Sequence, residues 1–132
     1  MSALRKRIDW MPSPPLAPHN PAYPDGPLDG EHLSRMTLGQ RDLEHEVLGL
    51  FLNQMDRVMD LLSGLGADSA VLAHTLKGAA LSIGAFGVAE AARGFEAAVR
   101  QGGATVKASA LTALRESVGA ARAAIEARLR QP

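Results

Sequence analysis

The segment 73–85 of this sequence, AHTLKGAALSIGA, carries the residue types best suited to chemistry. If its larger apolar residues face a core, His74, Lys77, Gly78 and Leu81 share the opposite side of a helix, because residues three, four and seven apart lie on one face. A neutral imidazole is a nucleophile near pH 7, and an ammonium group one turn away can stabilise negative charge that develops beside it. The spacing predicts an exposed histidine with a cation next to it.

A glycine inside a helix lowers helix stability by about 1 kcal/mol relative to alanine, so a function of Gly78 should offset this cost. Clear space beside His74, into which another protein's backbone could fit, is one reason for Gly78. The alternatives are ordinary ones. A single surface histidine or lysine often has no role, and mid-helix glycines, among them Gly49, Gly94 and Gly119, often serve packing. The three residues in this order on one stripe favour the functional interpretation.

Common enzyme motifs are not matched elsewhere in the sequence. His45-Glu46 begins like a zinc-protease helix, but Gly49 stands where the second histidine should be. The pair Gly64 and Gly66 has Ser69 where a dinucleotide-binding loop needs its third glycine. There is no Walker loop, no G-x-S-x-G motif and no cysteine, and the four histidines have no metal-binding spacing. We therefore expect neither a bound cofactor nor a metal ion.

Composition narrows the class of protein further. Fourteen Lys and Arg balance fourteen Asp and Glu, which argues against nucleic acid as a partner. The lack of cysteine fits a reducing compartment. No apolar run approaches the roughly 20 residues that cross a bilayer, and the basic cluster 5–7 is followed by prolines rather than by the apolar core of a signal peptide. We expect a cytoplasmic monomer that does not contact membranes.

The chain divides into an arm, 1–27, and a helical domain, 28–132. Seven of the eight prolines lie between Pro12 and Pro27, and proline lacks the backbone donor that helices and strands require. Before them, residues 2–10 could form two turns of helix that would need a surface on which to dock; a mobile leader is the alternative. The apolar side chains on one side of that short helix are Leu4, Ile8 and Met11.

The domain 28–132 is rich in alanine and leucine, and nothing in it alternates with a period of two. We expect a short helix over 29–36, with Leu33 and Met36 facing inward, and a long helix over about 40–63. The long helix has apolar residues at three- and four-residue spacing: Leu43, Val47, Leu50, Phe51, Met55, Val58, Leu61 and Leu62.

Three more helices are expected after the glycines at 64 and 66. The first begins at Asp68 or Ser69 and ends at a tight corner marked by Gly84 and Gly87. The next ends at 102–103 and the last runs toward the C-terminus. Their inward residues are Leu72, Leu76, Ala79, Ala80 and Ile83, then Val88, Ala91, Ala92, Phe95, Ala98 and Val99, then Leu111, Leu114, Val118, Ala121 and Ile125. The predicted fold is all-α, an antiparallel up-down-up-down four-helix bundle with a short extra N-terminal helix.

The segment His74-Thr75-Leu76-Lys77-Gly78, with Gly84-Ala85 behind it and Phe95-Glu96 a helix later, resembles the histidine-containing phosphotransfer (HPt) domains of bacterial two-component phosphorelays. The resemblance extends over most of residues 28–103 and includes Leu28-Asp29 and the helix before the histidine. The arm lies outside it, and the last helix matches only in pattern. The alanine-rich stretch 89–92 departs from the family, which tends to carry larger apolar residues there.

The resemblance implies that His74 accepts a phosphoryl group on Nε2 from the aspartyl phosphate of a receiver domain and passes it to another receiver. It implies that Lys77 stabilises the phosphoryl oxygens, that Gly78 leaves room for the receiver, and that Glu96 holds the other ring nitrogen. Glu96 as an ordinary surface carboxylate is an equal alternative. Arg100, one turn after Glu96, would be a second cation near the phosphate or a simple surface arginine.

The implied partners are response-regulator receiver domains, a hybrid histidine kinase, or both. The catalytic Mg²⁺ would belong to the receiver, and the chain, lacking an ATP-binding motif, would be a phosphocarrier without kinase activity of its own. A different class of function stays open: a non-catalytic helical adaptor that binds a receiver or kinase through the same surface.

Overall fold

The computed structural model describes residues 26–64 and 66–131 as helices joined by short turns, with no strand among them. The helices are α1 (Gly30–Met36), α2 (Arg41–Leu62), α3 (Ser69–Ile83), α4 (Phe86–Gln101) and α5 (Ala104–Leu129). The predicted all-α class is confirmed, with bounds close to the expected ones. The arm up to residue 25, including the short helix considered over 2–10, lies outside the described residues, and the domain boundary at 28 stays a prediction.

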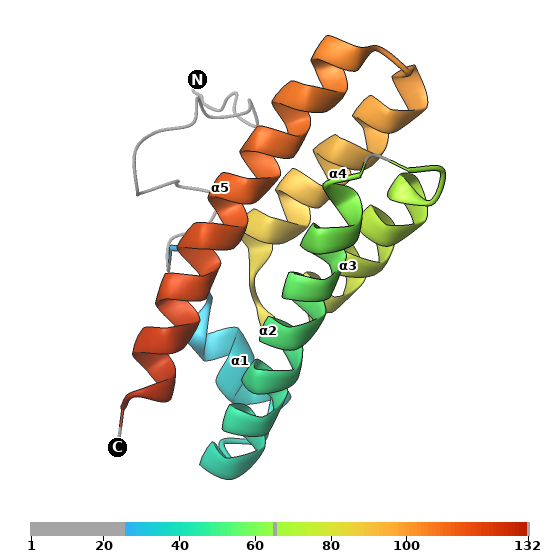
Figure 1. Cartoon of the computed structure of the whole chain (residues 1–132). Helices are drawn as coiled ribbons and strands as arrows, with labels where there is room; N and C mark the ends of the chain where they lie inside the picture. The colour runs from blue at the N-terminus through green and yellow to red at the C-terminus, as the bar shows by residue number, and fades with distance from the viewer. Residues whose placement is uncertain (1–25, 65, 132) are drawn as a thin grey trace, which may run out of the picture.

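The four long helices form an antiparallel bundle (Figure 1). Figure 1 shows α2 and α4 running in one direction and α3 and α5 in the other, with α1 across one end. Each long helix packs on the next, and α2 also packs on α5, so that α3 and α5 lie diagonally opposite. The up-down-up-down topology predicted from the sequence is therefore confirmed, and α1 packs against α3.

The core contains one row of side chains from each long helix, although the expected row on α2 was partly wrong. Leu48 is fully buried, whereas Leu50 and Leu61, expected inward, are exposed. The reason is that α2 has more apolar residues than its buried side can hold, and the row that faces the bundle follows Leu48, Phe51, Met55, Val58 and Leu62. The apolar periodicity predicted the helix correctly but did not predict which of its faces is buried.

The turn between α3 and α4 requires a glycine at position 84. Gly84 has φ +92°, a left-handed conformation, and a Cβ there would lie 3.0 Å from the carbonyl oxygen of Asp29. The backbone N–H of Asp29 donates to the Gly84 carbonyl at 2.9 Å, which joins the start of α1 to this turn. Gly87, expected to share the corner, is instead the second residue of α4, because the single glycine at 84 already reverses the chain.

Asp29 caps the start of the short helix α1, and the buried residue Thr37 follows its last residue. The Asp29 side chain accepts a hydrogen bond from the His32 backbone N–H at 3.0 Å. Leu33 is fully buried, as predicted, but Met36 is 41% exposed, so its inward placement was wrong. The inward position one turn after Leu33 is occupied by Thr37, whose hydroxyl donates to the Leu33 carbonyl at 2.9 Å.

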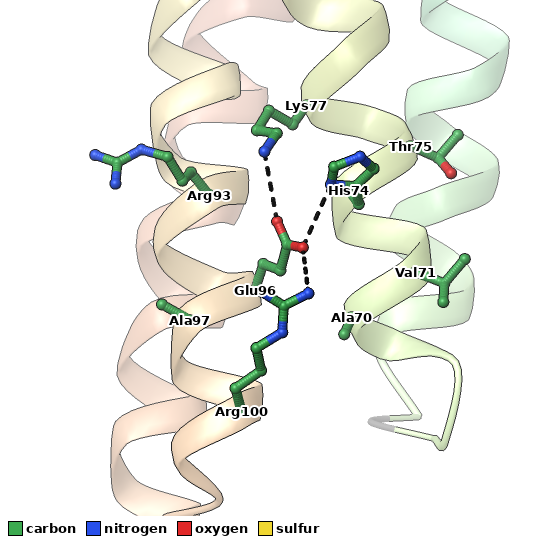
Figure 2. A pocket seen from close by; sticks show the side chains of 9 residues that line it. All are labelled: Ala70, Val71, His74, Thr75, Lys77, Arg93, Glu96, Ala97 and Arg100. Carbon is green, nitrogen blue, oxygen red and sulfur yellow. Dashed lines mark hydrogen bonds and ion pairs between the residues drawn. The ribbon is translucent and has the colours of Figure 1, made fainter.

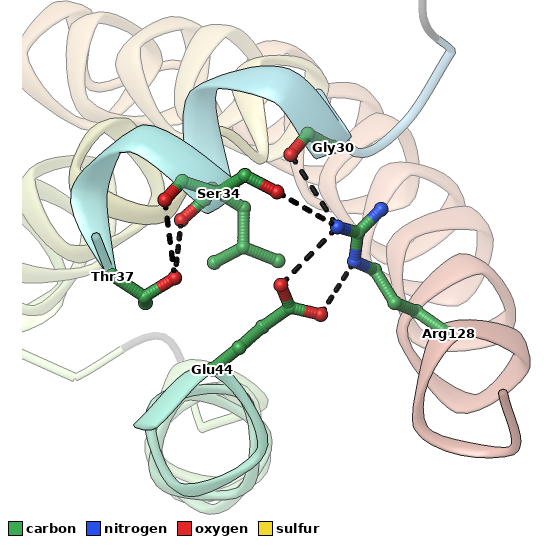
Figure 3. Close-up of polar contacts among 6 residues, drawn as sticks. Gly30, Ser34, Thr37, Glu44 and Arg128 are labelled. Carbon is green, nitrogen blue, oxygen red and sulfur yellow. Dashed lines mark hydrogen bonds and ion pairs between the residues drawn. The ribbon is translucent and has the colours of Figure 1, made fainter. Parts of the chain in front are cut away.

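An ion pair ties the end of the bundle together (Figure 3). The guanidinium of Arg128 on α5 donates to both carboxylate oxygens of Glu44 on α2, from Nε at 2.6 Å and from Nη2 at 3.2 Å. Its Nη2 also lies 3.2 Å from the hydroxyl of Ser34 on α1. The hydrogen bond from Arg128 lowers the pKa of Glu44 despite its burial. Three helices meet at this pair.

We expect Arg128→Met to lower the free energy of unfolding by about 2–3 kcal/mol, because it leaves a largely buried carboxylate without its partner. Urea denaturation measures this loss. The matched control is Arg122→Met, which removes an exposed ion pair: the side chain of Arg122 is 34% exposed and that of its partner Asp56 is 54% exposed. This variant should lose less than about 1 kcal/mol of unfolding free energy. Equal losses in the two variants would contradict the structural role of Arg128.

The same pair predicts a pH dependence. A carboxylate with a lowered folded-state pKa adds stability above its ordinary pKa of 4.5, and that stability is lost as the pH falls through the folded value. The difference in unfolding free energy between wild type and Glu44→Gln should therefore narrow as the pH is lowered below 4.5.

Candidate functional site

The candidate site lies between α3 and α4, which pack closely because small residues meet at their interface. Ala73 and Ala80 of α3 and Ala92 of α4 are completely buried. Short side chains at a helix contact allow the two axes to approach. Ala92 belongs to the alanine-rich stretch 89–92, and this close contact places Glu96 of α4 within reach of His74.

His74 projects from α3 toward solvent with one ring nitrogen turned to α4 (Figure 2). Its side chain is 64% exposed, and Nδ1 lies 3.3 Å from Oε2 of Glu96. The predicted exposure of the imidazole is confirmed. The opposite nitrogen, Nε2, lies on the far side of the ring from this carboxylate (Figure 2).

Glu96 is the centre of the polar cluster, and its side chain is only 7% exposed. Besides the imidazole, Nζ of Lys77 lies 3.7 Å from Oε1, and Nη2 of Arg100 donates to Oε2 at 2.8 Å. Figure 2 shows the three side chains converging on this one carboxylate from both helices. The structure thus brings together the four charged or titratable residues that the sequence singled out, and Glu96, for which an ordinary surface carboxylate was the alternative, is largely buried.

The charge balance of the cluster keeps Glu96 ionised. Burial by itself acts to raise the pKa of this carboxyl group, but the positive charges of Arg100 and Lys77 and the contact with His74 outweigh it, and the pKa is lowered from 4.5. A buried carboxylate is therefore present at neutral pH directly under the exposed imidazole.

Lys77 and Gly78 both belong to the stripe predicted from the sequence, but their surroundings differ. The side chain of Lys77 is only 25% exposed, because it turns toward Glu96 instead of pointing straight into solvent. No atom lies within 4 Å of a Cβ built on Gly78, so the glycine is not required by packing within this chain. Leu81, one turn further, is 47% exposed. The stripe therefore presents an imidazole, an open backbone and an apolar side chain.

The other helix glycines do not serve packing as had been considered. No atom lies within 4 Å of a Cβ built on Gly49, Gly94 or Gly119. An open glycine is therefore not in itself a sign of function in this chain, and what sets Gly78 apart is its place one turn from His74.

One residue beside the cluster was not anticipated from the sequence. Arg93 of α4 lines the same cleft as His74, along with Ala70, Val71, Thr75, Lys77, Glu96, Ala97 and Arg100. Its guanidinium pairs with Glu90, and in Figure 2 it points away from Glu96. The signal was available, since Arg93 precedes Glu96 by three residues and so lies on nearly the same side of α4.

This arrangement is suited to an exposed nucleophile that receives an anion. An imidazole oriented through one nitrogen offers a lone pair on the other. Two cations, Lys77 and Arg100, contact the same carboxylate as this imidazole and so lie close to it. Among the described residues no group of three or more His, Asp or Glu side chains is placed to hold a metal ion. No helix in the described part of the chain is long and apolar enough to cross a membrane.

Comparisons with known proteins agree with this geometry. The model of the Hpt domain family matches residues 46–124, which is more than half of the chain. A solved structure from rice, of a protein designated a histidine-containing phosphotransfer protein, has a TM-score of 0.71 with this chain at 22% identity. The match covers 80% of this chain and 81% of the rice chain, and at that identity it shows the fold. No curated protein matches the sequence.

Proposed function

Because this chain belongs to the Hpt domain family, we propose that it takes part in a phosphorelay by carrying a phosphoryl group on Nε2 of His74, between the phosphoaspartates of receiver domains. The observation that carries the proposal is the exposed His74 ring set over the buried carboxylate of Glu96, with Lys77 and Arg100 on the same carboxylate.

The chemistry needs little from this chain beyond orientation and charge. The Nε2 lone pair forms the new N–P bond while the acyl O–P bond of the donor breaks, and the aspartate leaves as a carboxylate. No proton has to move at Nε2. The ring that results carries positive charge, which the Glu96 carboxylate offsets from the Nδ1 side. In the neutral ring, Nδ1–H donating to Glu96 leaves the lone pair on Nε2.

Lys77 and Arg100 supply positive charge where phosphoryl oxygens would lie. In the unphosphorylated protein both are held by Glu96. Each has a long side chain that can turn toward a phosphoryl group on the adjacent ring without moving the helices, and cations in this position stabilise the charge of the transferring group. The Mg²⁺ used in the reaction belongs, in this proposal, to the receiver.

The partners are receiver domains, alone or as part of a hybrid histidine kinase, and the setting is the cytoplasm. The experiment supplies a receiver bearing a labelled phosphoaspartate and, in a parallel reaction, labelled ATP. We expect label to pass to this chain from the phosphorylated receiver, and we expect no label to pass to it from ATP. Tight binding of the receiver without loss of its label would favour the alternative, a non-catalytic adaptor using the same surface.

We expect Lys77→Ala to slow phosphotransfer, by less than the roughly hundredfold that follows loss of an oxyanion donor, because a partly solvated cation contributes less than a fully buried one. The loss should lie in the transfer step. Single-turnover transfer with saturating receiver measures it, and Lys107→Ala on α5 is the control. If the transfer rate at saturating receiver were unchanged and only receiver binding were weaker, Lys77 would act in docking and not in the transfer step.

Glu96 acts, in this proposal, as a positioning residue. We expect Glu96→Ala to reduce the transfer rate about tenfold and Glu96→Gln to retain more activity, since the amide oxygen still accepts a hydrogen bond from Nδ1. Nitrogen NMR of the ring supplies a readout that a purely structural role would not change. The Nδ1–H tautomer of His74 should dominate in wild type and lose that dominance in Glu96→Ala; identical tautomer populations would contradict the role.

A further inference from the structure

Three large apolar side chains from three helices are exposed around the C-terminal end of α3. Met36 of α1, Leu50 of α2 and Leu81 of α3 are 41%, 63% and 47% exposed. Met36 and Leu81 line one hollow and Leu50 lines another, and Ser82 lines both, so the two hollows are neighbours. We call Met36, Leu50 and Leu81 the apolar patch. Contiguous apolar surface of this kind marks a site where another segment binds.

The N-terminal part of the chain joins the domain beside this patch. The described residues begin at Gly26, and Leu28 is already buried. The next residue, Asp29, donates its backbone N–H to the carbonyl of Gly84, two residues beyond Ser82. The described part of the chain therefore begins next to the turn that follows Ser82.

The 25 residues that precede Gly26 contain an apolar segment followed by a spacer. Residues 4–11, LRKRIDWM, hold four apolar side chains, including the single tryptophan of the protein, Trp10. Residues 12–25 contain six prolines, and at about 3.1 Å per residue an extended spacer of this length reaches roughly 40 Å. The segment can therefore reach every part of the apolar patch from its tether.

We propose that residues 4–11 of this chain bind over the apolar patch. The tether supplies a millimolar effective concentration, so that even a weak contact is populated. Charge favours the same placement on the α2 side of the patch, while Arg35 on the Met36 side is paired with Glu31. Residues 5–7 are Arg-Lys-Arg, and the exposed carboxylates of Asp42 and Glu46 precede Leu50 on α2 by two turns and one turn. The apolar side chains of the segment cover the patch while its basic residues face these acids.

The fluorescence of Trp10 tests the proposal in the full chain, because no other tryptophan contributes. Emission of the folded wild type should lie at shorter wavelength than that of the same protein unfolded in urea. Leu50→Asp should weaken binding about tenfold and shift the emission toward the unfolded value, and Leu81→Asp should do the same. Circular dichroism checks that each variant is folded.

The control is Leu61→Asp, which places the same charge at another exposed leucine of α2 (53% exposed) that does not line the patch. Its emission should equal that of wild type. Wild-type emission that already equals the unfolded value would overturn the proposal, and so would an equal shift in Leu61→Asp. A shift that depends on protein concentration would show a second copy on the patch and would also overturn it.

If the proposed function is correct, binding of residues 4–11 also affects phosphotransfer. The fluorescence test does not depend on that function. Leu81 belongs both to the apolar patch and to the stripe of His74, so the bound segment would compete with a docking receiver. Trp10→Ser in the full chain should raise the transfer rate several-fold at limiting receiver and leave it unchanged at saturation. An unchanged rate at limiting receiver, beside a positive fluorescence result, would overturn the competition.

Discussion

Replacement of His74 by glutamine is expected to abolish phosphoryl acceptance while the protein stays folded. The side chain is 64% exposed and is not part of the hydrophobic core, so its loss has little effect on the packing that stabilises the bundle. Glutamine keeps a polar group of similar size but has no nucleophilic nitrogen. Label incorporated from a phosphorylated receiver measures the effect, and the melting temperature should change by no more than a few degrees.

Two of the other three histidines provide the controls for this variant. His32→Gln and His45→Gln should both accept label, since the first imidazole lies against the backbone of α3, with Nε2 at 3.0 Å from the Ser82 carbonyl, and the second lies on α2. Acceptance by the His74→Gln protein at any other histidine would show that the site assignment is wrong.

The second large effect is expected from Gly78→Glu. A glutamate at this position fills the open space one turn from His74 with a bulky anion, where a phosphorylated receiver must approach, so that a steric clash and like-charge repulsion act together. We expect transfer to fall about a hundredfold or more at limiting receiver. Stability should rise slightly, because glutamate is a better helix former than glycine and meets no atom within 4 Å.

Gly119→Glu is the matched control for that variant. Gly119 lies inside α5, also with open space around it, on the helix diagonally opposite α3. The same substitution there should raise stability to a similar degree and leave transfer unchanged. Loss of transfer in both variants, or in neither, would show that the effect does not come from the space beside His74.

Much of the candidate site could be predicted from the sequence because one helix carries it. The spacing of His74, Lys77 and Gly78 defines a common side once the helix is recognised, and the structure agrees for His74 and Gly78. The partial burial of Lys77 could not be predicted in this way. It depends on the position of Glu96 in another helix, and the distance between two helices is set by the small residues at their interface.

The errors in the fold have a similar origin. The pattern of α2 has apolar residues on more than one side, and only the packing of neighbouring helices decides that Leu48 is buried and Leu50 is not. The pair of Glu44 and Arg128 joins residues 84 positions apart, so no local spacing points to it. For α2, the apolar pattern left the rotation of the helix about its own axis open, whereas the rows predicted for α3, α4 and α5 are buried or partly buried.

The measurement that tests the central claim most directly is the identification of the atom that carries the phosphoryl group. The protein is incubated with a phosphorylated receiver, the adduct is tested for lability in acid and stability in alkali, and phosphorus–nitrogen NMR then assigns the bond. We expect an acid-labile, alkali-stable adduct with phosphorus on Nε2 of His74. Phosphorus on Nδ1, on another residue, or on no residue of this chain while the receiver stays bound would contradict the account.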